Sequence, residues 1–217
     1  MTRKMPPAVR EHAVQIAHHE MAHYVIARAL GFETGGVTLT VTMDLRHQGG
    51  ASISLVRSIS SMEAMREHLE ARMMVLFAGA MGQTLASKPS PKKIVDKSKA
   101  TAILKGEFGA EQDYAKIREL RHLLRNITYP DTDPASSDRI AAELKEITER
   151  VWFRTQKIVE ALADTITELG GTVVDGMVIV EQWGRAADTY EVVLTGEMLE
   201  RLRPVQAIPS LTVASKS

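Results

Sequence analysis

The chain has 217 residues, with 27 basic and 27 acidic side chains that give a formal net charge of zero. This balance gives no electrostatic reason to expect a nucleic-acid partner. The chain has no cysteine, which excludes disulfides and thiolate metal sites, so a transition-metal site must use His, Asp or Glu. The absence of cysteine fits a cytoplasmic location, which we expect.

The sequence has no feature of a secretory signal or a membrane span. Its first twenty residues contain several charges, and they lack the apolar segment of a signal peptide. The longest uncharged run, residues 73–87, is shorter than the roughly 20 apolar residues that cross a bilayer. We expect this run to form a buried helix.

The first predicted elements are a helix and a hairpin. Apolar residues recur at spacings of three and four from about residue 8 to residue 30, and Gly31 is placed to end that helix. Residues 36–45 and 50–58 are rich in β-branched side chains, and "RHQGG" between them supplies a turn. We therefore expect two antiparallel strands after the first helix.

The second helix is expected to begin at Ser60, because Ser60 and Glu63 fit a capping box, and to run to Leu85. Residues 86–107 are rich in Pro, Ser and Lys and have no strong periodicity, which indicates an exposed loop. A third helix is predicted over residues 112–126.

The rest of the chain is predicted to contain one long helix and little else. This helix spans about residues 138–169 and is expected to stop at Gly170 and Gly171. The Asp-Gly pair within residues 172–180 indicates a small hairpin. We expect residues 1–180 to form one mainly α domain and residues 181–217 to form a partly disordered extension.

The motif H-E-x-x-H lies within the first predicted helix, at His19, Glu20 and His23. Residues four apart share one helix face, so both imidazoles can reach one ion. Glu20 lies about 100° further around the helix, where it can address a water molecule beside the ion but not easily bind the ion itself. Two imidazoles and one carboxylate base are what metal-assisted hydrolysis requires.

A third ligand is needed, and the residues alone leave it open. The metzincin pattern is excluded because Ala29 stands where its third histidine would be. Glu63, Glu67 and Glu70 are candidates by type, although a solvated helix face is the simpler explanation for each. Asp113, in the first turn of the third long helix, is equally well explained as a ligand or as an acid that stabilises the helix N-terminus. His18 is interpreted as a surface residue rather than a neighbour of the site.

Several segments together resemble the proteolytic domain of the FtsH-type AAA+ zinc metalloproteases. The family's H-E-A-G-H is similar to "HEMAH" (19–23), its hairpin to residues 35–55, and its Ala- and Gly-rich helix to residues 72–86. Its G-A-x-N-D-L segment is similar to "GAEQDY" (109–114), although Gln112 and Tyr114 depart from that pattern. The resemblance covers roughly residues 10–180.

The resemblance implies an FtsH-like, mainly helical protease fold with a small sheet after the metal-binding helix. It implies Zn²⁺ held by His19, His23 and Asp113, with Glu20 as the catalytic base. Since the sequence has no room for the family's ATPase module, we expect ATP-independent hydrolysis of polypeptides. A homo-oligomer and a separately encoded ATPase are two expected kinds of partner. The alternative is an inactive, protease-like module that binds peptides or a partner protein.

Overall fold

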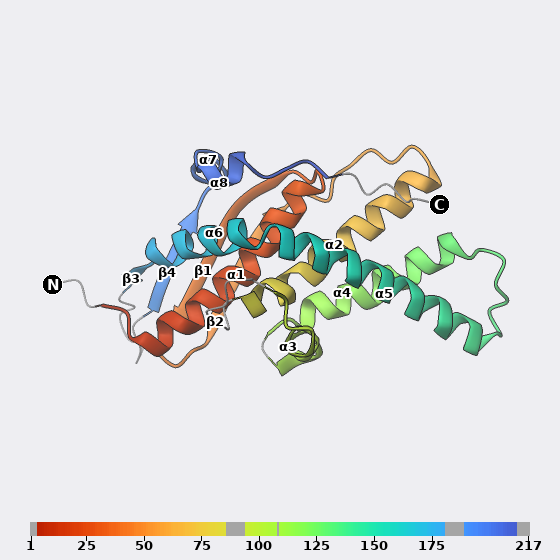
Figure 1. Ribbon diagram of the computed structural model, residues 1–217, viewed down its shortest axis with the longest axis horizontal. Helices are drawn as coiled ribbons and strands as arrows, with labels where there is room; N and C mark the ends of the chain where they lie inside the picture. Colours follow the sequence, from red (N-terminus) through yellow and green to blue (C-terminus); the bar gives the residue numbers. More distant parts are fainter. Residues whose placement is uncertain (1–3, 86–93, 108, 181–188, 212–217) are drawn as a thin grey trace.

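A computed structural model describes residues 4–85, 94–107, 109–180 and 189–211 of the protein. It is mainly helical with one four-stranded antiparallel sheet (Figure 1), as the sequence predicted at this level of detail. The helices are α1 (Pro7–Ala29), α2 (Met62–Leu85), α3 (Lys97–Ala102), the π-helical turn η1 (Ile103–Glu107), α4 (Glu111–Thr128), α5 (Ser137–Ala161), α6 (Ala163–Asp175), α7 (Gly196–Glu200) and α8 (Arg203–Gln206). The strands are β1 (Thr34–Thr42), β2 (His47–Ile53), β3 (Val178–Val180) and β4 (Thr189–Leu194).

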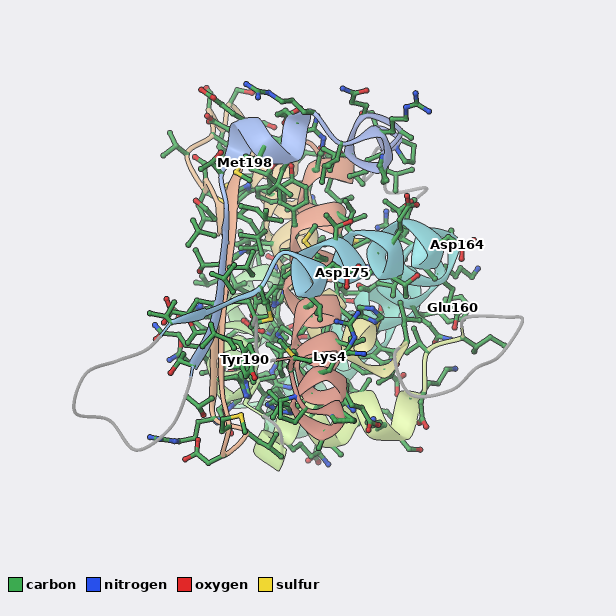
Figure 2. All side chains as sticks on the ribbon, turned by 90° about the vertical axis from the view of Figure 1, so that its left-hand side faces the viewer. Lys4, Glu160, Asp164, Asp175, Tyr190 and Met198 are labelled. Carbon is green, nitrogen blue, oxygen red and sulfur yellow. The ribbon has the colours of Figure 1, made fainter. Side chains whose placement is uncertain are left out.

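The sheet has the order β2-β1-β4-β3, which leaves β2 at one edge. Alternate residues of β1 and β4 face the core in register, so that Val37 lies opposite Leu194 and Leu39 opposite Val192. The side chains between them, such as that of Val193, face outward. Figure 2 views the sheet nearly edge-on, with α1 beside it and α6 crossing in front of α1 near the labelled Asp175.

α1 and α2 form the centre of the fold and are buried on almost every side over their adjoining halves. Glycines on α2 allow this close packing. A methyl group on Gly82 would lie 2.7 Å from the carbonyl oxygen of His18 on α1, which is too close for any side chain. The predicted buried helix over residues 73–87 is confirmed up to Leu85, the last residue described there.

α4 and α5 lie against α2 (Figure 1). Each of the two helices has one apolar face and charged residues on the other. Two groups of buried ions hold this part together. Arg125 of α4 donates to Glu143 of α5 at 2.8 Å. Arg154 of α5 donates to Glu70 of α2 at 2.9 Å.

Several predicted boundaries are wrong, each for a local reason. α2 is capped by Ser61, whose hydroxyl accepts the N–H of Ala64, and not by the expected capping box at Ser60. β2 begins at His47 and ends at Ile53, so both glycines of "RHQGG" belong to the strand and residues 54–58 do not.

Residues 94–107 form α3 and η1 instead of an exposed loop. The side chain of Asp96 accepts the N–H of Lys99 and begins α3, while Ile103 and Leu104 are buried in the core. The lysine-rich composition of this segment hid those apolar anchors. The remainder of the expected loop, residues 86–93, lies outside the described residues.

The expected long helix after residue 138 is interrupted at Leu162, and it does not stop at Gly170 and Gly171. α6 continues through both glycines to Asp175, so the expected hairpin over residues 172–180 does not form. A methyl group on Gly170 would overlap with the imidazole of His18, whereas one on Gly171 would meet nothing. Gly170 therefore serves close packing and not helix termination.

The sheet includes a strand from the part of the chain that we expected to be an extension. β4 pairs with both β1 and β3, and Tyr190, Leu199 and Val205 are buried in the core. The backbone N–H of Leu211 donates to the carbonyl of Ala29 at 2.7 Å. Residue 180 therefore does not mark the edge of the fold, and residues 212–217 lie outside the described chain.

Among the helices of the described chain, none combines the length and the apolar character needed to cross a membrane.

Candidate metal centre

Three side chains from two distant parts of the chain converge at one point. His19 and His23 lie one turn apart on α1, and Asp113 lies in the first turn of α4. The Nε2 atoms of the two imidazoles are 3.0 Å apart, and Oδ2 of Asp113 is 3.3 Å from that of His19 and 3.0 Å from that of His23. The structure therefore brings together the three residues that the sequence and the family resemblance named as ligands.

The other ring nitrogen of each histidine is held by α2. Nδ1 of His23 lies 2.7 Å from the carbonyl oxygen of Val75, and Nδ1 of His19 lies 3.0 Å from Oε1 of Gln83. Both partners are acceptors, so each Nδ1 must carry a proton and donate it. Each Nε2 therefore faces Asp113: its proton can be donated to the carboxylate, and once that proton is lost its lone pair has the orientation in which imidazole binds a metal.

This donor set fits a divalent transition metal. Two imidazole nitrogens and one carboxylate oxygen, all within 4.8 Å of one another, match the three-ligand arrangement of a hydrolytic zinc site with a position left for substrate or water. Three lone pairs that face one another repel unless a proton or a cation lies among them. The absence of thiolates and the His-carboxylate composition disfavour soft metals such as Cu(I).

Asp113 and His23 each stabilise the charged form of the other. Burial raises the pKa of Asp113, but the charge of His23 and the hydrogen bonds from both imidazoles outweigh it and bring the pKa well below its usual range. Burial lowers the pKa of His23, but the charge and hydrogen bond of Asp113 outweigh it and the pKa is raised. Asp113 is therefore an anionic ligand at neutral pH.

Glu20 is buried beside the ligands and faces the edge strand β2. A methyl group on Gly49 of β2 would lie only 2.7 Å from Oε1 of Glu20. Only glycine at this position lets the strand pass so close to the carboxylate. The carboxylate is therefore confined between α1 and the strand, next to the imidazoles and outside the ligand set.

Gly79 of α2 makes room for the imidazoles themselves. A methyl group there would lie 2.6 Å from Nε2 of His19 and closer still to Nε2 of His23. Since both rings are fixed at Nδ1 by hydrogen bonds, neither can swing away without losing one. Gly79, Val75 and Gln83 thus form a wall of α2 that orients both rings.

Beside the imidazoles lies one open cleft with a volume of about 350 Å³. The metal ligands and Glu20 are part of its wall, and Gly49, Gly50 and Ala51 of β2 form one side. His47 lies toward one end, where its Nδ1 is 3.1 Å from Nε2 of His12. Arg72 of α2 and Lys116 of α4 also line the cleft.

The other sequence candidates have different partners. Glu63 pairs with Arg66 on the surface, and Glu70 pairs with Arg150 and Arg154 of α5. His18, which we interpreted as a surface residue, is buried at 5% exposure and packs against Gly170. That interpretation is wrong because α6 covers the side of α1 on which His18 lies.

The residues that orient the ligands were missed by sequence reasoning. Gln83 and the carbonyl of Val75 belong to a helix that begins nearly forty positions after His23, and their types carry no signal by themselves. The spacing of Gly79 and Gly82 within "AGAMG" does indicate a close helix contact. It does not tell which helix makes that contact.

The chain was not matched to any known protein family or curated protein.

Proposed function

We propose that the protein is a zinc-dependent metallopeptidase, similar in its protease fold to the FtsH-type family and independent of ATP as a single chain. The observation that carries this proposal is the convergence of Nε2 of His19, Nε2 of His23 and Oδ2 of Asp113 beside the buried carboxylate of Glu20. Two neutral imidazoles, one carboxylate ligand and one carboxylate outside the ligand set are the components of metal-assisted peptide hydrolysis.

Each residue has a definite task in this reaction. His19, His23 and Asp113 would hold the ion, while Gln83 and the Val75 carbonyl keep the imidazole lone pairs directed at it. Bound zinc supplies Lewis acidity, which polarises the scissile carbonyl and makes water more acidic. Glu20 takes the proton of the attacking water and delivers it to the leaving amine nitrogen.

The substrate proposed for this cleft is an extended segment of polypeptide. β2 is an edge strand, and its residues Gln48, Gly49, Gly50 and Ala51 line the cleft beside Glu20. Their free backbone groups can pair with a peptide by strand addition, which does not depend on the peptide's side chains. Gly49 lets the strand, and a peptide paired with it, lie close to the catalytic carboxylate.

The decisive variant is Glu20→Gln, assayed on an unfolded casein with zinc-loaded protein. The amide keeps the shape of the side chain but cannot accept the proton, so cleavage is expected to fall by about 100-fold or more. Zinc content, measured by atomic absorption, should stay that of the wild type because Glu20 is not a ligand. Full activity of the variant would exclude the proposed role of Glu20.

A chelator distinguishes the enzyme from the alternative, a protease-like module that binds peptides without cleaving them. Casein cleavage by the wild type should disappear with a chelator and return when zinc is added back. If no chelator-sensitive cleavage is detected at any zinc concentration, the peptide-binding module becomes the better description. A homo-oligomer or a separately encoded ATPase remains a proposed partner that the same assay can test by addition.

A further inference from the structure

The cleft has two ends of different charge. Around His47, at the start of β2, the ionisable neighbours are His12, the proposed ligand His19 and the carboxylate of Glu111. At the other end β2 finishes at Ile53, and the cleft is bounded there by Arg72 of α2. Arg72, Leu76 and Gly79 share one face of α2 at helical spacing, so Arg72 lies about two turns from the metal centre.

Arg72 differs from the arginines that form ion pairs along α5. Arg125, Arg150 and Arg154 each donate to a buried carboxylate. Within the described residues no carboxylate forms a hydrogen bond or an ion pair with Arg72. Burial lowers its pKa, and only the field of Asp113 opposes that effect. A cation that is desolvated without a partner costs free energy, unless a ligand supplies the missing anion.

The surroundings of Arg72 are rich in basic side chains. The pKa of His68, one turn before Arg72 on α2, is lowered by burial and by the charges of Arg57 and Arg72, which keeps this imidazole neutral. Lys116 follows Asp113 by about one turn of α4 and lines the cleft as well. When a divalent ion offsets the charge of Asp113, the remaining carboxylates of the described lining are those of Glu20 and Glu111, and neither forms an ion pair with Arg72 or Lys116.

Together with the proposed peptidase function, on which this inference rests, the geometry points to a substrate subsite. We propose that Arg72, assisted by Lys116, binds a carboxylate of the peptide about two helical turns from the metal centre. A guanidinium binds carboxylates through two parallel hydrogen bonds, and the low dielectric of a cleft strengthens such a pair. The protein would then prefer peptides that carry an acidic side chain, or a free C-terminus, at that distance from the scissile bond.

The test measures binding and not cleavage, so that its outcome does not depend on the catalytic proposal. Zinc-loaded Glu20→Gln protein is titrated against fluorescein-labelled peptides, and binding is followed by fluorescence polarisation. The peptides form matched sets: a position scan of Glu against Gln with amidated ends, and one neutral sequence with a free or an amidated C-terminus. The first set reports an acidic side chain, and the second reports the terminal carboxylate.

The carboxylate-bearing peptide of one set should bind about tenfold or more tightly than its neutral match. Adding Arg72→Met should remove that preference, Arg72→Lys should restore part of it, and high salt should weaken it. Arg66→Met is the matched control, because Arg66 lies on the same helix but pairs with the surface carboxylate of Glu63. It should leave the preference unchanged.

Two results would overturn the subsite. One is equal affinity for the charged and neutral peptides of both sets, and the other is a loss of preference in Arg66→Met as large as in Arg72→Met. If Arg72→Met does not fold, Lys116→Met takes its place, since Lys116 is exposed and its removal should reduce the preference by a smaller factor. An unchanged preference in Lys116→Met would then count against the proposal. Normal casein cleavage together with equal peptide affinities would reject the subsite alone.

Discussion

The α1–α2 pair and the α4–α5 pair are both two-helix units, but different interactions hold them together. α1 and α2 meet through glycines and small apolar residues, and the contact leaves no space for an added methyl group at Gly79 or Gly82. α4 and α5 are amphipathic and are joined by buried ion pairs, such as that of Arg125 with Glu143. The α1–α2 contact depends on steric fit, and the α4–α5 contact depends on ion pairs.

The proposed metal ligands come from both helix pairs. His19 and His23 are oriented from the α1–α2 contact, whereas Asp113 comes from the first turn of α4. We therefore expect small changes of volume in the α1–α2 contact to affect metal binding strongly. Changes of charge in the α4–α5 pair should affect stability and leave the metal centre intact.

The largest expected effect is that of Gly79→Ala. The added methyl group would overlap with both imidazoles, which cannot move without losing their hydrogen bonds to Val75 and Gln83. The zinc dissociation constant should rise by about 100-fold or more, measured by competition with a chromogenic chelator. Gly171→Ala is the control, because a methyl group there meets nothing and zinc affinity should not change. Wild-type affinity in Gly79→Ala would show that the contact is not rigid.

Gln83→Met should have the next largest effect on the metal. It removes the acceptor that fixes the ring of His19 but keeps a similar volume in a position only 1% exposed. Zinc affinity is expected to fall by about 10- to 100-fold, as it does when a partner of a metal-bound histidine is lost. The far-ultraviolet circular dichroism spectrum should stay that of the wild type. A change in that spectrum would assign Gln83 to folding instead.

The adjacent glycines of α6 test close packing without touching the ligands. Gly170→Ala should lower the free energy of unfolding by roughly 1–3 kcal/mol, because its methyl group overlaps with His18. Gly171→Ala should raise it by up to about 1 kcal/mol, since alanine is the better helix former and has free space. Urea denaturation measures both. Equal effects of the two substitutions would contradict the proposed role of Gly170 in packing.

The smallest effect on the metal is expected from Glu143→Gln in the α4–α5 pair. Burial raises the pKa of Glu143, but hydrogen bonds from Thr132, Arg125 and Arg139 outweigh it, so the folded pKa lies below its ordinary 4.5. Its contribution to stability is therefore present above that value and is lost as the pH falls through the folded pKa. The wild type should lose more stability than Glu143→Gln on acidification, measured by thermal denaturation. Zinc affinity at neutral pH should be equal in the two proteins.

The family resemblance named all three side chains that converge in the structure, but local patterns alone did not. Spacing identified His19 and His23 as a pair and Glu20 as the neighbouring base, because positions along one helix are fixed by its geometry. Asp113 was left between two interpretations, since a first-turn acid also stabilises a helix N-terminus. In the structure the two interpretations are compatible. Asp113 lies in the first turn of α4, and its carboxylate contacts both imidazoles.

The sequence by itself determined the approximate extents of α1, α2 and α4 and the place of His19 and His23 on one helix face, because periodicity and the H-E-x-x-H spacing act within a single segment. Only the tertiary structure decided what those residues face. Gln83, Gly49, Gly170 and Arg72 acquire their roles from partners on other elements, and no local pattern encodes such a contact. The central place of β4 has the same origin, because a strand's neighbours in a sheet are chosen by the packing of the whole chain.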